Sequence, residues 1–244
     1  MHTEELKHHF ENNNIFDTKD ITEFYRSFEP DLKKSTINWR VYTLVQKGIL
    51  ERIGRGKFVL GKEQKYRPEI TAHLKKIYNK VHKEFPFLDL CIWNTSVLNE
   101  FMIHQPFRLF TLVETDKDAK SPVFHYLRES LSEVFLDPDS EILENYLPEN
   151  KTPVFVRPLV SEAPLQTVDG VKTATLEKIL VDLFCEPVLF NAYQGSELSN
   201  IYRGAFERYT VNHNKLLRYA RRRGKQNELK SYLNKLKLPA VNTN

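Results

Sequence analysis

Several carboxylates stand two positions apart, a spacing at which acidic side chains can share a divalent metal ion. Asp116 and Asp118 form one such pair, and Asp137 and Asp139 form another. A nucleotidyltransferase needs a Gly-Ser turn that holds phosphates, closely followed by its metal-binding pair. Here the dipeptide Gly195-Ser196 comes after both pairs. We therefore interpret these carboxylates as loop residues.

Asp89 with Asp118 and Lys120 could form the site of a metal-dependent nuclease, because an acid and a lysine can position metal and water. A chain in which 28% of the residues are charged yields such triplets readily. The sequence contains no Gly-rich phosphate loop, paired metal-binding histidines or nucleophile elbow. Cys91 and Cys185 stand among apolar neighbours, which is typical of reduced core thiols. We expect no enzymatic activity, no metal and no cofactor, with the nuclease as the alternative from the enzyme class.

Basic side chains are concentrated near the C-terminal end. Residues 203–244 hold eleven Lys or Arg against two acidic residues, whereas residues 69–202 carry a net charge of −8. This asymmetry attracts polyanions, so nucleic acid becomes the leading partner class. A solvated helical face would give the same run, and a second feature is needed. The residues expected to contact DNA phosphates here are Arg218, Arg221, Arg222 and Arg223.

The first sixty residues supply a second feature that indicates nucleic-acid binding. Their predicted elements follow one another in the order of a winged helix-turn-helix. Apolar spacing predicts a short opening helix and a second helix from Asp17 or Thr18 to Phe28. A third helix is predicted from about residue 31 to Lys47, with Gly48 as its left-handed cap. Strands over 49–53 and 57–60 are predicted to form a hairpin around Gly54-Arg55-Gly56.

In a winged helix the third helix enters the major groove and the hairpin contacts the backbone or the minor groove. The predicted DNA contacts are the polar residues off the buried stripe of that helix and the basic residues of the hairpin: Lys33, Lys34, Ser35, Thr36, Asn38, Arg40, Arg55 and Lys57. Arg52 is a weaker candidate. Trp39 is interpreted as a packing residue. A protein-interaction module is the alternative reading of the whole segment.

The rest of the chain predicts a mixed α/β domain that ends in a helical subdomain, so the fold class is α+β. We place the domains at 1–64 and 65–244, because the polar stretch before Pro68 separates the patterns. The apolar run 87–93 suits a central strand buried on both faces. Further strands are expected at 108–114, 134–136 and 153–157, with a hairpin around Asp169-Gly170, and helices follow Thr175. Asp182 lies among apolar residues and needs a partner if it is buried.

Composition and length fit an ordinary globular protein. The chain has 244 residues, of which 41% are hydrophobic, and no apolar run approaches the roughly 18–20 residues of a membrane span. The polar N-terminus does not resemble a signal peptide. We expect a cytoplasmic protein that does not associate with a membrane.

Three blocks resemble the AbiEi-type antitoxins of bacterial abortive-infection systems. They are Leu44-x-x-Lys47-Gly48-Ile49-Leu50-x-Arg52-x-Gly54-Arg55-Gly56-x-Phe58-x-Leu60, Thr175-Leu176-Glu177-Lys178-Ile179-Leu180-Val181-Asp182-Leu183 and Leu217-x-Tyr219-Ala220-Arg221-Arg222-x-Gly224. The second block is similar to the family pattern Pro-Glu-Arg-x-Leu-Val-Asp, with Leu176 in place of proline and Lys178 in place of arginine. Phe58 replaces the usual tyrosine. Residues 69–165 match only in general pattern.

The resemblance implies an antitoxin of a type IV toxin-antitoxin system. Its N-terminal winged helix represses its own operon by binding double-stranded operator DNA, and its C-terminal domain counteracts a toxin of nucleotidyltransferase type. Glu177 and Asp182 are interpreted as structural residues that pair with the arginine-rich helix. The alternative is a ligand-responsive winged-helix transcriptional regulator without a toxin partner.

Overall fold

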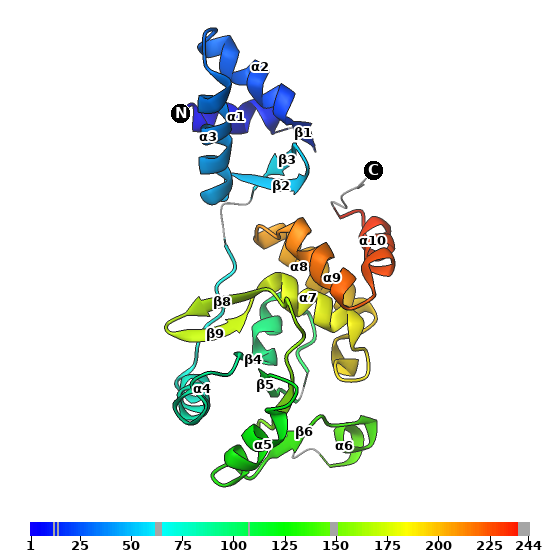
Figure 1. Cartoon of the computed structure of the whole chain (residues 1–244). Helices are drawn as coiled ribbons and strands as arrows, with labels where there is room; N and C mark the ends of the chain where they lie inside the picture. The colour runs from blue at the N-terminus through cyan, green and yellow to red at the C-terminus, as the bar shows by residue number, and fades with distance from the viewer. Residues whose placement is uncertain (12, 14, 62–64, 107, 147–150, 239–244) are drawn as a thin grey trace.

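The computed structural model describes residues 1–11, 13, 15–61, 65–106, 108–146 and 151–238. The fold is mixed α+β, with the N-terminal elements at one end of the molecule and the remaining sheets and helices below them (Figure 1). The N-terminal elements are α1 (Thr3–Phe10), β1 (Phe16–Asp17), α2 (Thr18–Phe28), α3 (Lys34–Gln46), β2 (Leu50–Gly54) and β3 (Lys57–Leu60).

Local chemistry sets the boundaries of these elements. The Asp17 carboxylate accepts hydrogen bonds from the backbone N–H groups of Lys19 and Asp20, and Asp20 accepts from the backbone of Asp17 in return. This reciprocal capping box starts α2 where the sequence predicts it. Gly48, at φ 74°, ends α3, and Gly56, at φ 68°, closes the hairpin. The strands form an antiparallel sheet in the order β1-β3-β2.

A separate apolar core holds these elements together. It is built by Leu6 and Phe10 of α1, Ile21, Phe24 and Tyr25 of α2, Ile37, Val41 and Leu44 of α3, and Leu50 and Phe58 of the hairpin. The i, i+4 and i+7 spacing in α3 therefore fixes which face of that helix turns inward. The opposite face is left for solvent or a partner.

A four-stranded sheet organises the second part of the chain. Its strands are β4 (Leu90–Asn94), β5 (Thr111–Thr115), β6 (Val134–Leu136) and β7 (Val154–Pro158), in the order β4-β5-β7-β6. β5, β7 and β6 are parallel, and β4 is antiparallel to β5. The prediction of a central strand at 87–93 is wrong, because β4 lies at the edge of the sheet. It is buried because α4, α7 and the hairpin β8 (Leu165–Val168) and β9 (Val171–Ala174) cover it.

Helices cover both faces of this sheet. Leu90 and Ile92 face a core formed with α4 (Ala72–Glu84) and α5 (Lys120–Arg128). Cys91 and Trp93 face the opposite core, formed with α7 (Leu176–Cys185) and the helices after it. The alternation of side chains along β4 thus serves two cores, as the continuous apolar run predicts. The 3-10 helix η1 (Thr95–Phe101) follows β4 directly.

The C-terminal helices join the two parts. They are α8 (Ser196–Arg208), α9 (His213–Arg222) and α10 (Gln226–Lys235), with the shorter helices α6 (Ser140–Asn145) and η2 (Asn191–Tyr193) elsewhere in the second part. α9 packs on α7 and also contacts β2 of the N-terminal sheet. Ile53 of β2 belongs to the large core of the second part. Over the described residues, no helix has the length and apolarity that crossing a membrane requires.

Candidate nucleic-acid interface

The outward face of α3 lies opposite the buried residues Ile37, Val41 and Leu44. Lys34, Ser35 and Asn38 are exposed on this face. Trp39 is 61% exposed and Tyr42 is 63% exposed. The interpretation of Trp39 as a packing residue is therefore wrong, because Ile37, Val41 and Leu44 fill the buried stripe instead. α3 presents hydrogen-bonding and aromatic side chains together.

The first turn of α3 adds cations and backbone donors. Lys33 and Lys34 are exposed, Thr36 is half-buried, and the side chain of the N-cap residue Lys33 does not cap the helix. The first N–H groups of a helix favour anions, because they carry the positive end of the helix dipole. This end of α3 is suited to holding a phosphate group.

Arg40 occupies a different environment from its neighbours on α3. Its guanidinium donates to both carboxylate oxygens of Glu29, at 2.8 and 3.1 Å, and lies 4.9 Å from the centre of the Tyr25 ring. Its side chain is only 14% exposed. The Arg40 hydrogen bonds hold the pKa of Glu29 below its usual range. Arg40 therefore connects α3 to the end of α2, and a base contact would require breaking this pair.

The hairpin carries exposed cations at its turn. Arg55 and Lys57 are both exposed, beside Gly56 at the turn. The Gly56 carbonyl accepts a hydrogen bond from the Thr18 N–H at 2.9 Å, which fixes the turn against the start of α2. Arg52 lies on β2, with its guanidinium 5.4 Å from the centre of the Phe58 ring.

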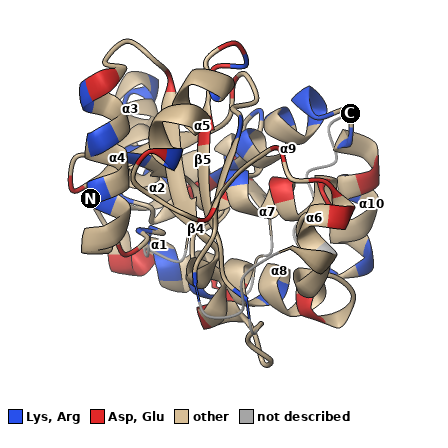
Figure 2. Cartoon of the chain, turned by 90° about the horizontal axis from the view of Figure 1, so that it is seen from below, with Lys and Arg blue, Asp and Glu red and all other residues tan. Residues whose placement is uncertain are grey.

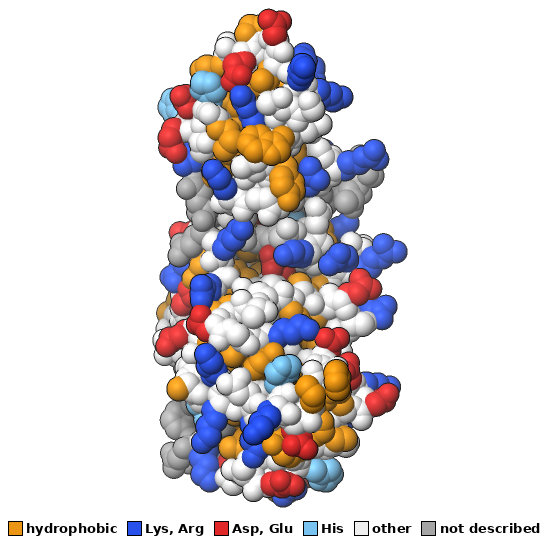
Figure 3. All heavy atoms as spheres, turned by 60° about the vertical axis from the view of Figure 1, so that its left-hand side comes forward, with side chains coloured by type: hydrophobic (Ala, Val, Ile, Leu, Met, Phe, Trp, Pro, Cys, Tyr) orange, Lys and Arg blue, Asp and Glu red, His pale blue; other side chains and the backbone are white. Residues whose placement is uncertain are grey.

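A groove of about 370 Å³ connects α3 to α9. Its lining includes Tyr42 and Gln46 from α3, Arg52 from β2, and Asn214, Lys215 and Arg218 from α9. The Asn214 side-chain amide donates to the Arg52 carbonyl at 3.5 Å across this junction. Figure 3 shows hydrophobic side chains of the N-terminal part flanked by Lys and Arg side chains. Two basic segments far apart in the sequence thus reach one surface.

The four predicted arginines of the C-terminal region are not equivalent. Arg218 and Arg221 are exposed on α9, whose basic positions are marked in Figure 2. Arg222 is also exposed, but its Nε donates to the Ser161 hydroxyl at 2.6 Å. Arg223 donates to Asp182 at 2.8 Å and to Glu186 at 2.6 Å, and its side chain is 14% exposed. We assign Arg223 a structural role and remove it from the candidate DNA contacts.

The groove residues Tyr42 and Lys215 were not among the predicted DNA contacts, and Arg52 was only a weaker candidate. Helical spacing is the sequence feature that places Tyr42 and Lys215 beside the predicted contacts. Tyr42 follows Asn38 by four positions and Ser35 by seven, so it shares their helical face. Lys215 precedes Arg218 by three positions on α9 in the same way. Nothing in the sequence shows that α3 and α9 meet, because that juxtaposition is set by the packing of β2 on α9.

The carboxylates of α7 take part in an internal ion network. Lys178 is fully buried, and its Nζ donates to Glu114 at 2.7 and 2.8 Å and to Asp182 at 2.6 Å. The Trp93 indole also donates to Glu114, and the Tyr219 hydroxyl donates to Asp182. Burial acts to lower the pKa of Lys178, but attraction by Asp182 and Glu114 outweighs it and raises this pKa well above its usual value.

The predicted pairing of Glu177 and Asp182 with the arginine-rich helix is confirmed. Asp182 binds Arg223 directly, and Glu177 accepts from the backbone N–H of Asn212, the N-cap of α9, at 2.8 Å. These two carboxylates of α7 hold both ends of α9. They therefore position the basic face of α9 without belonging to it.

The residues of the alternative nuclease site are engaged in separate contacts. Asp89 binds Lys172 at 2.8 Å, and Lys120 binds Asp137. Within the described part of the chain, no group of three His, Cys, Asp or Glu side chains is arranged to hold a metal ion. The geometry favours the basic surface as the candidate site.

A family model matches most of the chain. The model of a family of unknown function, DUF6577, matches residues 36–239. No curated protein matches the chain. The match begins inside α3 and extends beyond α10, so it spans both parts of the structure.

Proposed function

We propose that this chain, which belongs to the DUF6577 family of unknown function, is a cytoplasmic, non-enzymatic regulator that binds double-stranded operator DNA. The observation that carries the proposal is the outward face of α3, which continues through the groove to Arg218 of α9. An exposed polar helix face next to a basic surface is the arrangement that duplex DNA requires, because bases are read in the major groove and phosphates are neutralised beside it.

The order of the N-terminal elements supports a winged helix-turn-helix. Three helices precede a hairpin, and the short strand β1 pairs with the second strand of that hairpin. α3 takes the position of the recognition helix in such a module, and the turn at Arg55 takes the position of the wing. In this proposal Asn38 contacts base edges, while Lys33, Lys34, Arg55 and Lys57 contact phosphates.

A binding experiment tests this proposal. A labelled duplex from upstream of the gene is titrated with the protein in excess unlabelled nonspecific DNA, and its affinity is compared with that of a scrambled duplex. We expect tighter binding to the upstream duplex by a factor of about 10³ or more. The double variant Asn38→Ala, Tyr42→Ala changes only exposed residues, and we expect it to lose at least about tenfold in affinity for the upstream duplex alone.

The matched control is Lys75→Ala, Lys76→Ala, which removes two exposed cations from α4. This variant keeps the preference for the upstream duplex if α3 is the reading helix. Equal binding of the two duplexes by folded wild-type protein contradicts the proposal.

We further propose that this regulator is the antitoxin of a toxin-antitoxin pair and opposes a toxin of nucleotidyltransferase type. The support is the resemblance of its three sequence blocks to AbiEi-type antitoxins. Expression of the protein encoded beside it is expected to arrest growth, and co-expression of this chain is expected to restore it. Arrest that persists on co-expression contradicts the antitoxin role and leaves DNA binding unaffected.

A regulator that responds to a small molecule, with no toxin partner, is the second candidate. A specific observation favours it: the second part of the molecule contains an apolar cavity of about 460 Å³, away from the basic surface. Ligands of drug size occupy cavities of roughly 300–1,000 Å³.

A further inference from the structure

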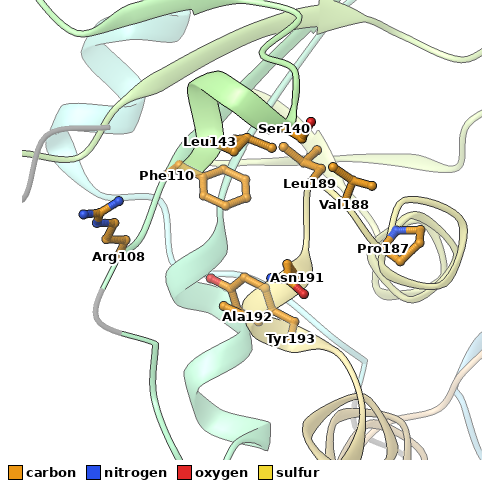
Figure 4. Close-up of a pocket in the computed structure, with 10 residues that line it drawn as sticks. All are labelled: Arg108, Phe110, Ser140, Leu143, Pro187, Val188, Leu189, Asn191, Ala192 and Tyr193. Atoms are coloured by element: carbon orange, nitrogen blue, oxygen red, sulfur yellow. The ribbon is translucent and has the colours of Figure 1, made fainter. Parts of the chain in front are cut away.

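This cavity lies where the sheet meets the segment after α7. Residues from three segments line it, among them Arg108 and Phe110 before β5, Leu143 of α6, and Leu189, Ala192 and Tyr193 of the segment that contains η2. Figure 4 shows Phe110, Leu143 and Leu189 around the space, with Arg108 at its edge.

The apolar wall of the cavity is built on buried aromatic rings. The Phe110 ring lies 4.7 Å from that of Phe155 and 5.8 Å from that of Phe190, centre to centre. Phe190 in turn stacks on Trp93 at 5.9 Å. Because these rings belong to the large core, the wall keeps its shape without a ligand. A preformed apolar wall of this kind suits a flat, ring-sized apolar group.

Tyr193 contributes to the wall from inside the core. It is 1% exposed, and its hydroxyl is enclosed. Burial raises the pKa of Tyr193 to about 12, and a hydrogen bond with the Thr95 side chain acts in the opposite direction, so this hydroxyl stays protonated. The Tyr193 ring therefore completes the apolar wall, and recognition of a charged group depends on the edge of the cavity.

Arg108 is the charged residue of the lining. Its side chain is half-buried, and it forms no ion pair with the residues that the structure describes. Rotation about its side-chain torsions can carry the guanidinium over the opening. A guanidinium binds a carboxylate through two parallel hydrogen bonds, which makes a carboxylate a better partner for it than a neutral acceptor.

We propose that this cavity binds a small organic carboxylate with an apolar, ring-sized body. The ring lies on Phe110, Leu143 and Leu189, and the carboxylate is held by Arg108 at the edge. This inference does not rest on DNA binding, since no residue of the basic surface takes part in it.

Calorimetric titration of the full chain with 2-naphthoate and with its neutral isostere 2-naphthamide tests the proposal. We expect wild-type protein to bind the carboxylate at least about tenfold more tightly than the amide. The variant Arg108→Gln is expected to bind the two compounds equally. Tyr193→Phe, which removes only an enclosed hydroxyl, is expected to keep the preference for the carboxylate.

Two further variants locate the site. Ala192→Trp, at an exposed lining position, is expected to fill the cavity and abolish binding of both compounds, with folding checked by thermal unfolding. Arg128→Ala removes an exposed arginine from α5 and should leave both affinities unchanged. The proposal is overturned if wild-type protein binds neither compound at millimolar concentration, binds both equally, or binds the carboxylate unchanged in folded Ala192→Trp protein.

Discussion

At the scale of single residues, the buried cation Lys178 defines the centre of the second part of the molecule. Its ammonium is completely enclosed and donates three hydrogen bonds to the carboxylates of Glu114 and Asp182. These buried ion pairs are not by themselves evidence that the fold is more stable, because removing the charges from water costs free energy. Their role is to fix α7 against β5, since Glu114 lies on β5 and Asp182 on α7.

Removing this cation should destabilise the protein strongly. Lys178→Met leaves the buried Glu114 carboxylate without a counter-charge and Asp182 with Arg223 as its remaining cation. We expect it to lower the free energy of unfolding by about 3–5 kcal/mol. Urea unfolding followed by circular dichroism measures this change. Lys75→Met, at an exposed position on α4, should cost less than about 0.5 kcal/mol. A loss below about 1 kcal/mol for Lys178→Met contradicts the assigned role.

Glu51 predicts a pH dependence of stability. It is 8% exposed at the junction of β2 and α9, and burial, opposed by a His213 backbone hydrogen bond and aided by the Glu177 charge, raises its pKa to about 8. The folded state therefore keeps a proton that the unfolded state releases near pH 4.5, and stability is lost as the pH rises between these values. Burial lowers the pKa of His213, 3.9 Å away, to about 4, so this imidazole stays neutral across most of the window.

The variant Glu51→Gln removes this titration and retains the shape of the protonated acid. We expect its stability to exceed that of wild-type protein increasingly from pH 5 to pH 8, by up to about 1.4 kcal/mol for each pH unit. Urea unfolding of both proteins at pH 5, 6.5, 8 and 9 measures the difference, and the comparison cancels the contribution of His213. A difference that does not change with pH rules out a raised pKa for Glu51.

At the scale of elements, the sequence predicts local structure well where a side chain caps or fills the element it belongs to. Asp17 predicts the start of α2, Gly48 the end of α3, and the apolar stripe of α3 its buried face. The prediction from sequence is wrong where the position of an element depends on the elements packed against it. β4 has the pattern of a central strand but lies at an edge, because the β8-β9 hairpin supplies the cover that another strand would give.

The candidate site shows the same division. The exposure of Lys34, Ser35, Asn38, Arg55 and Lys57 follows from their spacing. The ion pairs of Arg40 with Glu29 and of Arg223 with Asp182 do not follow from the spacing. Each carboxylate comes from another segment of the chain, and the spacing does not predict where that segment lies. The groove between α3 and α9 was equally unpredictable, as it depends on the contact between β2 and α9.

The basic face of α9 should contribute to affinity through phosphate contacts. Each neutralised phosphate steepens the dependence of log affinity on log salt concentration by about 0.9. We therefore expect the double variant Lys215→Ala, Arg218→Ala to reduce this slope by about one to two, with little change in sequence preference. Affinities measured at several salt concentrations give the slope. An unchanged slope removes α9 from the DNA interface.

At the scale of the whole molecule, the N-terminal part and the second part share one surface. Ile53 packs into the large core, Asn214 reaches the Arg52 carbonyl, and Glu177 holds the start of α9. The division proposed at residues 64 and 65 leaves Ile53 of the N-terminal part in the large core of the second part. A duplex lying on α3 would meet the cations of α9 in the orientation that this junction fixes.

Hydroxyl-radical footprinting on the DNA upstream of the gene tests the central claim most directly. We expect wild-type protein to protect a short block of this DNA in the presence of nonspecific competitor. We also expect that Lys215→Ala, Arg218→Ala loses protection at the edge of the block, whereas Asn38→Ala, Tyr42→Ala loses the block entirely. Uniform cleavage of the upstream DNA by hydroxyl radicals in the presence of folded wild-type protein would contradict the account.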